Sequence, residues 1–346
     1  MQFGIWTPAP ISIRPDETIL EAFHGLGKAG NEGPDPAHQF AVDTIRRAEE
    51  LGFDVTLIAE RYYGEDIEAW LMSASLAEAT SRIEIMTAVH PSIISPQLAA
   101  KMAASMDRIS GGRSSVNVVN GARKPEFDLY GEWLEMEAPR YRRMDEFIKV
   151  MKACWADDEV SFKGEFYEIE NGRQFLHPQT MPHPPLYAAT RTSEGMDVVA
   201  RHCDTWFCSY HLDFRRYEES AAKIEGDIKD MERRIAGRSR PMGYGLSALV
   251  IMADTDAEAI ARAEEYEDHC RTSTFTKTPV VALGAGLVGS RKTVIERIRR
   301  YQDIGVNLLM LHFWPMREGL EEFAREVMGE IAPIPPSSEQ VHYATT

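Results

Sequence analysis

The chain has 346 residues and a formal net charge of −16 at pH 7, and its basic residues form no stripe, so nucleic acid and anionic membranes are poor partners. No apolar run reaches the roughly 18 residues of a membrane span, and the amino-terminal stretch MQFGIWTPAP lacks the pattern of a signal peptide. The four cysteines have neither CxxC nor zinc-like spacing, so we expect a cytoplasmic protein without a bound metal.

Strands and helices alternate along the chain. Short apolar or β-branched runs predict eight strands, and each is followed by a segment whose apolar residues recur three or four positions apart, as in amphipathic helices. The predicted strands are residues 3–7, 54–59, 83–89, 115–119, 185–190, 204–208, 246–252 and 307–312. This alternation, without a break in composition, predicts one α/β domain, a (β/α)8 TIM barrel with loop insertions.

Four segments fall outside the alternation. Residues 8–36 form a long Pro/Gly-rich connection after the first strand, and residues 157–181 form a small insertion that resembles a hairpin. Residues 270–289 are rich in Thr and Gly and are a candidate mobile lid. Residues 332–346 look like a terminal extension of the single domain.

Polar residues follow several of the predicted strands. Ligand and catalytic groups of such barrels sit at the carboxyl ends of the strands, where this chain places His90, Asn117, Asn120 and His312. A histidine titrates near neutral pH and suits proton transfer, although a structural hydrogen bond is the commoner role of a lone histidine. His90 and His312 are therefore the candidate catalytic residues.

A second group of residues is suited to an anion. Arg191, Thr192 and Ser193 stand between the predicted strand 185–190 and the next helix, where backbone N–H groups, hydroxyls and a guanidinium favour phosphate. The alternative, that Thr192 or Ser193 merely caps the helix, is equally consistent with this segment. Arg140-Tyr141 opens another helix and brings a second cation and a phenol to the same rim, which suggests a phosphorylated ligand.

Residues 284–289 read GAGLVG, which is a literal GxGxxG pattern. We reject a dinucleotide-binding fold, because too few residues follow and the next strand ends at His312 instead of an acidic residue. We expect a flexible loop whose Ser290 caps the helix that begins near Arg291.

The sequence resembles the bacterial luciferase-like flavin monooxygenase superfamily, nearest its alkanesulfonate, dimethyl sulfone and pyrimidine monooxygenase branch. The resemblance is most specific in SRIEIMTAVHPSIISPQLAAKMAASMDRISGGRSSVNVVNGARKPEF and continues in PRYRRMDEFIKVM and PPLYAATRTSEGM. It implies a homodimer or homotetramer that binds reduced FMN (FMNH2) from a separate NAD(P)H:flavin reductase. O2 would then give a flavin peroxide that oxygenates a small organic substrate, an organosulfur compound or an N-heterocycle.

The resemblance also implies roles for single residues. The implied flavin contacts are Glu60, Arg61, Asn117, Asn120, Glu126, Arg140, Tyr141, Arg191, Thr192 and Ser193. Of these, Asn117 and Asn120 would contact the flavin ring, and Glu126 would orient the ribityl chain or its loop. The residues that would hold the phosphate are Arg140, Tyr141, Arg191, Thr192 and Ser193.

The substrate side departs from the sulfonate branch. Tyr63, Tyr210 and Trp314 are candidates to line it. Ser247 and Leu249 stand where the sulfonate enzymes carry basic residues, so an anionic headgroup would lack its partners. Two alternatives remain open: a deazaflavin (F420)-dependent dehydrogenase on the same barrel, and a non-catalytic flavin-binding protein.

Overall fold

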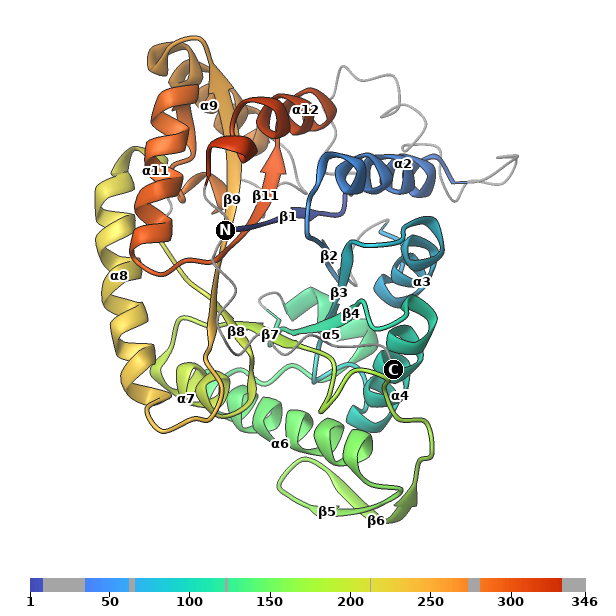
Figure 1. Cartoon of the computed structure of the whole chain (residues 1–346). Helices are drawn as coiled ribbons and strands as arrows, with labels where there is room; N and C mark the ends of the chain where they lie inside the picture. The colour runs from blue at the N-terminus through green and yellow to red at the C-terminus, as the bar shows by residue number, and fades with distance from the viewer. Residues whose placement is uncertain (9–34, 62–65, 122–123, 212, 273–280, 332–346) are drawn as a thin grey trace. The chain divides into compact units, whose positions relative to one another are not determined.

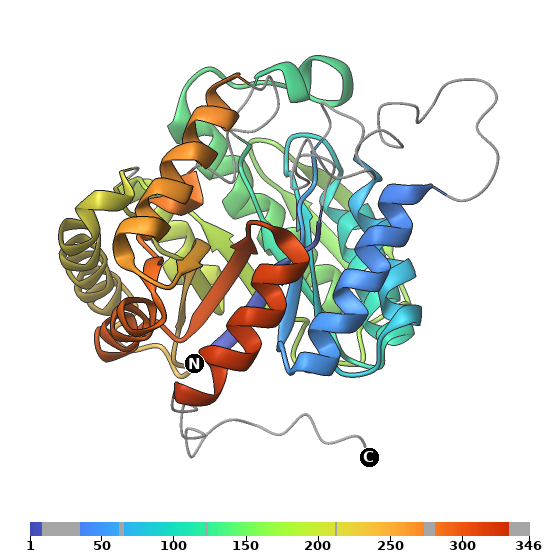
Figure 2. The same cartoon turned by 90° about the horizontal axis from the view of Figure 1, so that it is seen from above.

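A computed structural model of the chain describes residues 1–8, 35–61, 66–121, 124–211, 213–272 and 281–331 (Figures 1 and 2). The expected long connection, the centre of the expected lid, the expected tail and Tyr63 lie outside these ranges. No helix in the described ranges combines the length and the apolar content that crossing a bilayer requires.

The elements alternate as the sequence predicts, with strand ends within two or three residues of the expected ones. The strands are β1 (Gln2–Trp6), β2 (Val55–Ile58), β3 (Glu84–Val89), β4 (Ser114–Val118), β5 (Glu159–Lys163), β6 (Glu168–Arg173), β7 (Leu186–Ala189), β8 (Thr205–Phe207), β9 (Gly243–Ala253), β10 (Val288–Ser290) and β11 (Leu308–Phe313). The helices are α2 (Pro36–Leu51), α3 (Ala69–Ala79), α4 (Pro96–Ser110), α5 (Lys124–Tyr130), α6 (Glu137–Ala156), α7 (Ser193–His202), α8 (Tyr217–Arg234), α9 (Asp256–Thr272), α11 (Arg291–Asp303) and α12 (Met316–Glu326), with 3-10 turns η2 (Phe214–Arg216) and η3 (Met328–Glu330).

The strands form the predicted barrel. One sheet has the order β10-β9-β11-β1-β2-β3-β4-β7-β8, and β8 also pairs with β9. The eight strands from β9 to β8 therefore close into a ring with helices between them, which is the (β/α)8 TIM barrel class. The short strand β10 pairs with β9 and lies outside this ring, and neither it nor α5 was predicted from the sequence.

The described residues fall into two compact units. The first unit is drawn from Met1–Thr56, Phe207–Arg233 and Gly243–Ile334, and the second from Leu57–Trp206 and Arg234–Met242. In the first unit β1 and β9 flank β11, all parallel, and α12 contacts α2 (Figure 2). Phe313 packs on Phe323 of α12 with ring centroids 5.5 Å apart. Since side chains alternate along a strand, His312 faces the opposite side of β11.

In the second unit β3, β4 and β7 are parallel neighbours. The hydroxyls of Thr87 on β3 and Ser73 on α3 lie 2.7 Å apart, so Thr87 faces the helices. By alternation Ala88 faces the other side of the sheet, and Asn117, which is paired with Ala88 in the strand register, faces that side too. The register therefore turns Asn117 away from the helical layer.

Apolar residues recur at helical spacing in α4, at Leu98, Met102, Met106 and Ile109, but of these only Met106 is fully buried. Ser95 caps its start and Gly111, at φ 68°, ends it in the left-handed region. Small residues, including Ala99, Ala100, Ala103 and Ala104, make the buried face, whereas Leu98 and Ile109 are exposed. Both α3 and α6 contact this helix, and small side chains allow such neighbours to approach closely.

The insertion at residues 157–181 contains the expected hairpin. Strands β5 and β6 pair antiparallel. Glu146 on α6 accepts hydrogen bonds from the backbone N–H groups of Glu165 and Phe166 in the turn, at 2.7 and 2.8 Å. Tyr167 donates its hydroxyl proton to the carbonyl of Pro91 at 2.7 Å. These bonds tie the hairpin to α6 and to the segment that follows β3.

Candidate active site

The start of helix α7 is where the sequence predicts an anion site. Strand β7 ends at Ala189, and the polar turn that follows leads into a helix with Thr192 as its N-cap. The Thr192 hydroxyl oxygen accepts a hydrogen bond from Gly195 N at 3.1 Å. The capping interpretation is therefore confirmed, although a capped helix start can still bind an anion through its remaining amides.

Tyr141 lies directly against this helix start. Thr190 donates its hydroxyl proton to the Tyr141 hydroxyl oxygen at 2.8 Å. A Cβ on Gly195 would lie 2.6 Å from the Tyr141 ring and would overlap the Thr190 hydroxyl, so the ring packs on the bare backbone of α7. Thr190 was missed in the sequence, where it reads only as the last residue of a strand.

Arg140 is held near the same place by an aromatic ring. Its Cζ lies 4.5 Å from the centroid of Trp133, and its Nη1 donates to the carbonyl of Gly121 at 3.4 Å. The Arg140 Nε is buried and has no hydrogen-bond partner. A half-buried guanidinium with one buried, unused donor is suited to an anionic ligand.

The other two phosphate candidates differ from each other. Arg191 is exposed. Ser193 is engaged, because Arg234 donates to its hydroxyl oxygen at 2.9 Å and to its carbonyl at 3.3 Å, and Arg234 also pairs with Asp197. Arg234 was missed because it lies 41 residues away in sequence from Ser193, at the end of α8.

Two amides at the end of β4 have unused hydrogen-bonding atoms. Asn117 is 5% exposed, and its Oδ1 is buried without a partner. The Nδ2 of Asn120 is likewise buried and unpaired. Such groups are rare in folded proteins, so one free acceptor and one free donor indicate a polar ligand at this strand end. A flavin ring, which carries both donors and acceptors on one edge, fits this pair.

His90 and Glu60 form a buried pair at the ends of β3 and β2. His90 Nε2 lies 3.3 Å from the backbone oxygen of Glu60. Burial lowers the pKa of His90 to about 4, so the imidazole is neutral at pH 7. Glu60 Oε2 accepts from Ala69 N at 2.9 Å, and burial raises the pKa of this carboxyl to about 7. Glu60 thus binds the first amide of α3, whose N-cap is Glu68, and this gives its side chain a structural role.

The remaining implied flavin contacts of the second unit are Arg61 and Glu126. Arg61 lies 3.8 Å from Asp66, and its Nη1 is buried without a hydrogen-bond partner. Glu126 lies in α5, and its side chain is outside the described part of the structure.

In the first unit His312 stands in an aromatic array. Trp6 stacks on it, with ring centroids 4.9 Å apart and planes 12° apart. Trp6 Nε1 donates to the hydroxyl of Ser247 at 3.1 Å. This bond uses one lone pair of the Ser247 hydroxyl, so the hydroxyl can still donate its own proton to another acceptor. Aromatic and uncharged polar groups therefore gather here from the ends of β1 and β11 and from the middle of β9.

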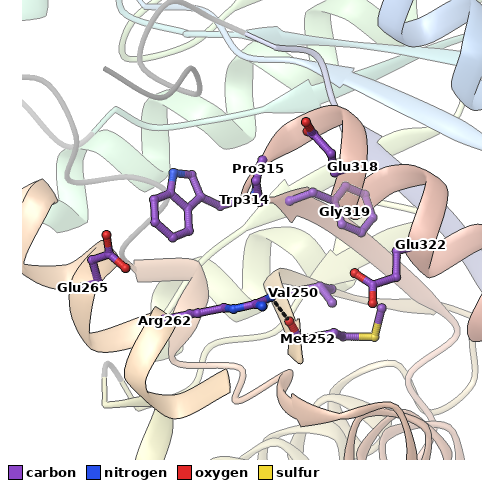
Figure 3. A pocket seen from close by; sticks show the side chains of 10 residues that line it. Val250, Met252, Arg262, Glu265, Trp314, Pro315, Glu318, Gly319 and Glu322 are labelled. Atoms are coloured by element: carbon purple, nitrogen blue, oxygen red, sulfur yellow. Dashed lines mark hydrogen bonds between the residues drawn. The ribbon is translucent and has the colours of Figure 1, made fainter. Parts of the chain in front are cut away.

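Trp314 and Tyr210 belong to the same unit. Trp314 packs edge-on against Tyr266 at 5.1 Å and lines a cavity of about 350 Å³ (Figure 3). Arg262 also lines this cavity, and its Nη1 donates to the Met252 carbonyl at 2.9 Å. Tyr210 packs on the backbone of Gly284.

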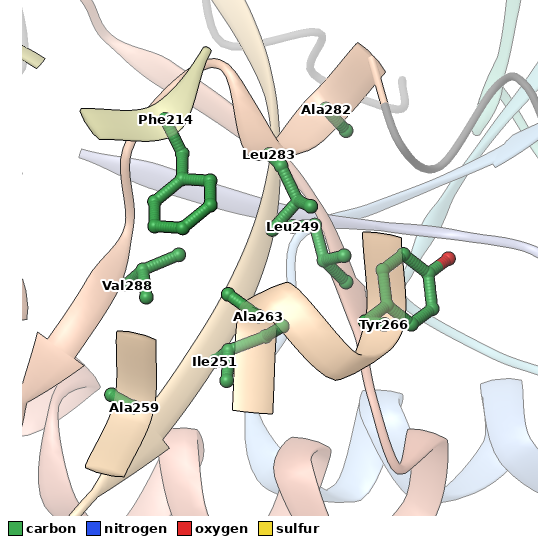
Figure 4. Packing of buried hydrophobic residues seen from close by; sticks show 9 residues of the cluster. All are labelled: Phe214, Leu249, Ile251, Ala259, Ala263, Tyr266, Ala282, Leu283 and Val288. Carbon is green, nitrogen blue, oxygen red and sulfur yellow. The ribbon is translucent and has the colours of Figure 1, made fainter. Parts of the chain in front are cut away.

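The GAGLVG segment is packed instead of forming the expected flexible loop: it makes a tight turn that leads into β10, and the rejection of a nucleotide fingerprint is consistent with its bonds. Its carbonyl oxygens accept hydrogen bonds from side chains: the Ser220 hydroxyl donates to Gly284, the Tyr301 hydroxyl donates to Ala285, and Arg297 donates to Gly286 and Val288. The amides of residues 284–286 bond the carbonyls three residues earlier. Ser290 caps α11 as predicted. Leu283 and Val288 join a buried cluster with Leu249, Ile251 and Phe214 (Figure 4).

The family model described as luciferase-like monooxygenase matches residues 1–308. The chain belongs to the luciferase-like monooxygenase family. This confirms the family and the class of enzyme that the sequence motifs predict.

Among relatives of this luciferase-like monooxygenase is an FMNH(2)-dependent dimethylsulfone monooxygenase from Pseudomonas putida, 31% identical over 315 residues, which cover 81% of this chain and 84% of the relative. The solved EDTA monooxygenase from Chelativorans sp. BNC1 superposes with a TM-score of 0.71 at 15% identity, covering 94% of this chain and 92% of that one. A monooxygenase from Streptomyces bottropensis gives 0.73 at 20% identity, with 96% and 100% covered. The two solved structures support the barrel fold.

The structure of this luciferase-like monooxygenase brings part of the predicted site together. Within the second unit, Tyr141 packs on the helix start that carries Thr192 and Ser193, with Arg140 in the same turn of α6. His90 packs beside the phenyl ring of Phe127, 5.9 Å between centroids. His312, Tyr210 and Trp314 belong to the first unit.

Proposed function

We propose that this luciferase-like monooxygenase takes reduced FMN from a separate NAD(P)H:flavin reductase and uses O2 to oxygenate a small organic substrate. The observation that carries the proposal is the start of α7, where Tyr141 and Thr190 pack on Gly195 beside Arg140. When bound, reduced FMN supplies the electrons that activate O2. The other steps of binding and proton handling fall to the side chains of this chain.

At the phosphate end, five residues would hold the ligand. Arg140 and Arg191 supply positive charge, Tyr141 and Ser193 supply hydroxyls, and Thr192 caps the helix so that its dipole favours an anion. At the ring end, Asn117 Oδ1 suits an N–H of the flavin and Asn120 Nδ2 suits a carbonyl oxygen.

Proton handling would fall to His90 and His312. A neutral imidazole at His90 can donate a hydrogen bond from one ring nitrogen and accept one at the other. Glu60, Arg61 and Glu126 stay predicted contacts of the cofactor, with Glu60 contributing chiefly by fixing the start of α3.

On the substrate side, Tyr63, Tyr210 and Trp314 stay the predicted contacts. The array of Trp6, Ser247 and His312 favours an uncharged substrate with a hydrogen-bond acceptor, such as a sulfone or an N-heterocycle. The name of the Pseudomonas putida relative, a dimethylsulfone monooxygenase, supports the organosulfur choice. We expect a homodimer or homotetramer by family likeness.

The test uses the full chain, a flavin reductase, NAD(P)H, FMN and O2 with a panel of sulfones, sulfonates, pyrimidines and amines. We expect oxygenated product from an uncharged member. The variant Arg191→Ala with Tyr141→Phe should weaken reduced-FMN binding roughly ten-fold or more, since it removes one charge-assisted bond and one hydroxyl. Unchanged affinity in that variant would refute the phosphate site.

Two other results would replace this function. Hydride transfer to a deazaflavin without O2 consumption would make the chain a dehydrogenase. Tight binding of oxidised FMN without turnover of any panel member would make it a flavin-binding protein.

A further inference from the structure

Arg140 differs from its neighbours on α6 in what holds its guanidinium. Arg142 pairs with Glu165 at 2.9 Å, and Arg143 pairs with Glu132 at 2.5 Å. Among the described residues, no carboxylate is placed in ion-pair contact with Arg140. One face of its guanidinium lies 4.5 Å from the centroid of Trp133 instead.

Trp133 is itself anchored to the core. Its ring lies 5.3 Å from the ring of Phe127, which is 1% exposed. Phe127 occupies the space beside Gly121, at φ 72°, where any Cβ would overlap its ring. The Gly121 carbonyl in turn accepts from Arg140 Nη1 at 3.4 Å. Arg140 is thus held on one side by a ring and on another by a backbone oxygen.

This support leaves the positive charge in place. A carboxylate partner would offset the charge of the guanidinium and take up its donors, as Glu165 and Glu132 do for Arg142 and Arg143. The face of an indole ring attracts a cation but carries no net charge, so the guanidinium keeps its charge and its edge donors for a ligand. The buried, unpaired Nε of Arg140 is one such donor.

We propose that Trp133 is a specificity-determining residue of the flavin site, because it holds Arg140 ready for the phosphate of FMN without neutralising it. The inference rests on the proposed function and adds to it the residue that makes the site select FMN over riboflavin, which lacks the phosphate. Trp133 acts through Arg140 and is a positioning residue.

The experiment compares the affinities of reduced FMN and reduced riboflavin, measured by anaerobic ultrafiltration. The proteins are the wild type, Trp133→Leu and Trp133→Phe. Loss of the ring in Trp133→Leu should weaken FMN binding by roughly five- to thirty-fold and leave riboflavin binding unchanged. Trp133→Phe keeps an aromatic face and should retain most of the preference for FMN.

A matched control comes from the same helix. Arg143 lies over the ring of Phe166 at 4.9 Å but also has its carboxylate partner. Phe166→Leu should therefore leave the ratio of FMN to riboflavin affinity unchanged. In an Arg140→Ala background, Trp133→Leu should cause no further loss of FMN affinity, since the two act together.

Two results would overturn the inference and leave Trp133 a structural role. One is that Trp133→Leu weakens the binding of both flavins equally. The other is that Trp133→Leu and Arg140→Ala cause additive losses of FMN affinity in the double variant. A wild type that binds both flavins equally would overturn the phosphate site itself, which is a separate failure. If Trp133→Leu does not fold, fluorinated tryptophans at position 133 weaken the ring quadrupole at nearly constant shape. FMN affinity must then fall with each added fluorine, and a flat series refutes the proposal.

Discussion

Gly195 shows how a missing side chain can shape a binding site. Tyr141 and Thr190 occupy the volume next to its Cα, and their hydroxyls bond each other at 2.8 Å. The residue sits inside α7, where glycine is otherwise unfavourable by about 1 kcal/mol relative to alanine. That cost is explained by the close approach of the tyrosine ring to the helix.

We expect Gly195→Ala to displace Tyr141 and to destabilise the fold by about 1 to 3 kcal/mol through overpacking, with weaker FMN binding. Urea denaturation and flavin titration measure the two effects. Gly226→Ala on α8 is the matched control, because a Cβ there meets nothing within 4 Å. That change should stabilise the protein by about 0.5 to 1 kcal/mol. Equal effects of the two substitutions would contradict the packing argument.

At the level of elements, α4 and α6 hold the insertion through single carboxylates. Asp107 on α4 is fully buried and accepts three hydrogen bonds, from Gln179 N at 2.6 Å, Thr180 N at 2.7 Å and the Thr180 hydroxyl at 2.7 Å. Glu146 on α6 does the same for the hairpin turn. The insertion is therefore fastened at its hairpin turn and at its carboxyl end, which the irregular sequence of residues 157–181 did not indicate.

Replacing Asp107 by Ala leaves the amides of Gln179 and Thr180 and the hydroxyl of the buried Thr180 without their acceptor. We expect a loss of about 2 to 4 kcal/mol in the free energy of unfolding, and faster amide exchange at Gln179 and Thr180. The comparison is Asp128→Ala, which removes only an exposed ion pair with Lys124 and should cost less than about 1 kcal/mol. A small effect of Asp107→Ala, or unchanged exchange, would show that other contacts hold the segment.

For the whole molecule, two buried groups make stability depend on pH in opposite directions. Burial raises the Glu60 pKa from 4.5 to about 7, so the native state binds an extra proton and stability falls as pH rises through this range. Burial lowers the His90 pKa from 6.5 to about 4, so stability falls as pH drops from 6.5 to 4. The two effects offset each other in part in the wild type.

Single variants separate the two groups. We expect Glu60→Gln to gain stability relative to the wild type as pH rises from about 4.5 to 7, by up to about 3 kcal/mol. His90→Gln should gain relative to the wild type as pH falls from about 6.5 to 4. Urea denaturation across pH 4 to 8 measures both differences. Curves parallel to that of the wild type would mean that neither group is perturbed by burial.

The sequence predicts the barrel well because its strands are short apolar runs and its helices have regular spacing. It also predicts Asn117, Thr192 and Tyr141 as site residues, since polar groups at strand ends and helix starts can be read locally. Thr190, Arg234 and Trp133 could not be found this way, because their roles depend on contacts with residues distant in sequence. The exposed Leu98 and Ile109 show the same limit, since spacing does not tell which face a neighbouring helix covers.

The GAGLVG loop has a consequence for how such patterns are used. In a true phosphate-binding loop the main-chain donors point outward and await a ligand. Here the donors of residues 284–286 are consumed by a tight turn, while the acceptors are bound by Ser220, Arg297 and Tyr301. An engineered nucleotide site at this place would first have to free the backbone N–H groups of the loop from the turn. The glycine spacing alone therefore does not provide a site for a second cofactor.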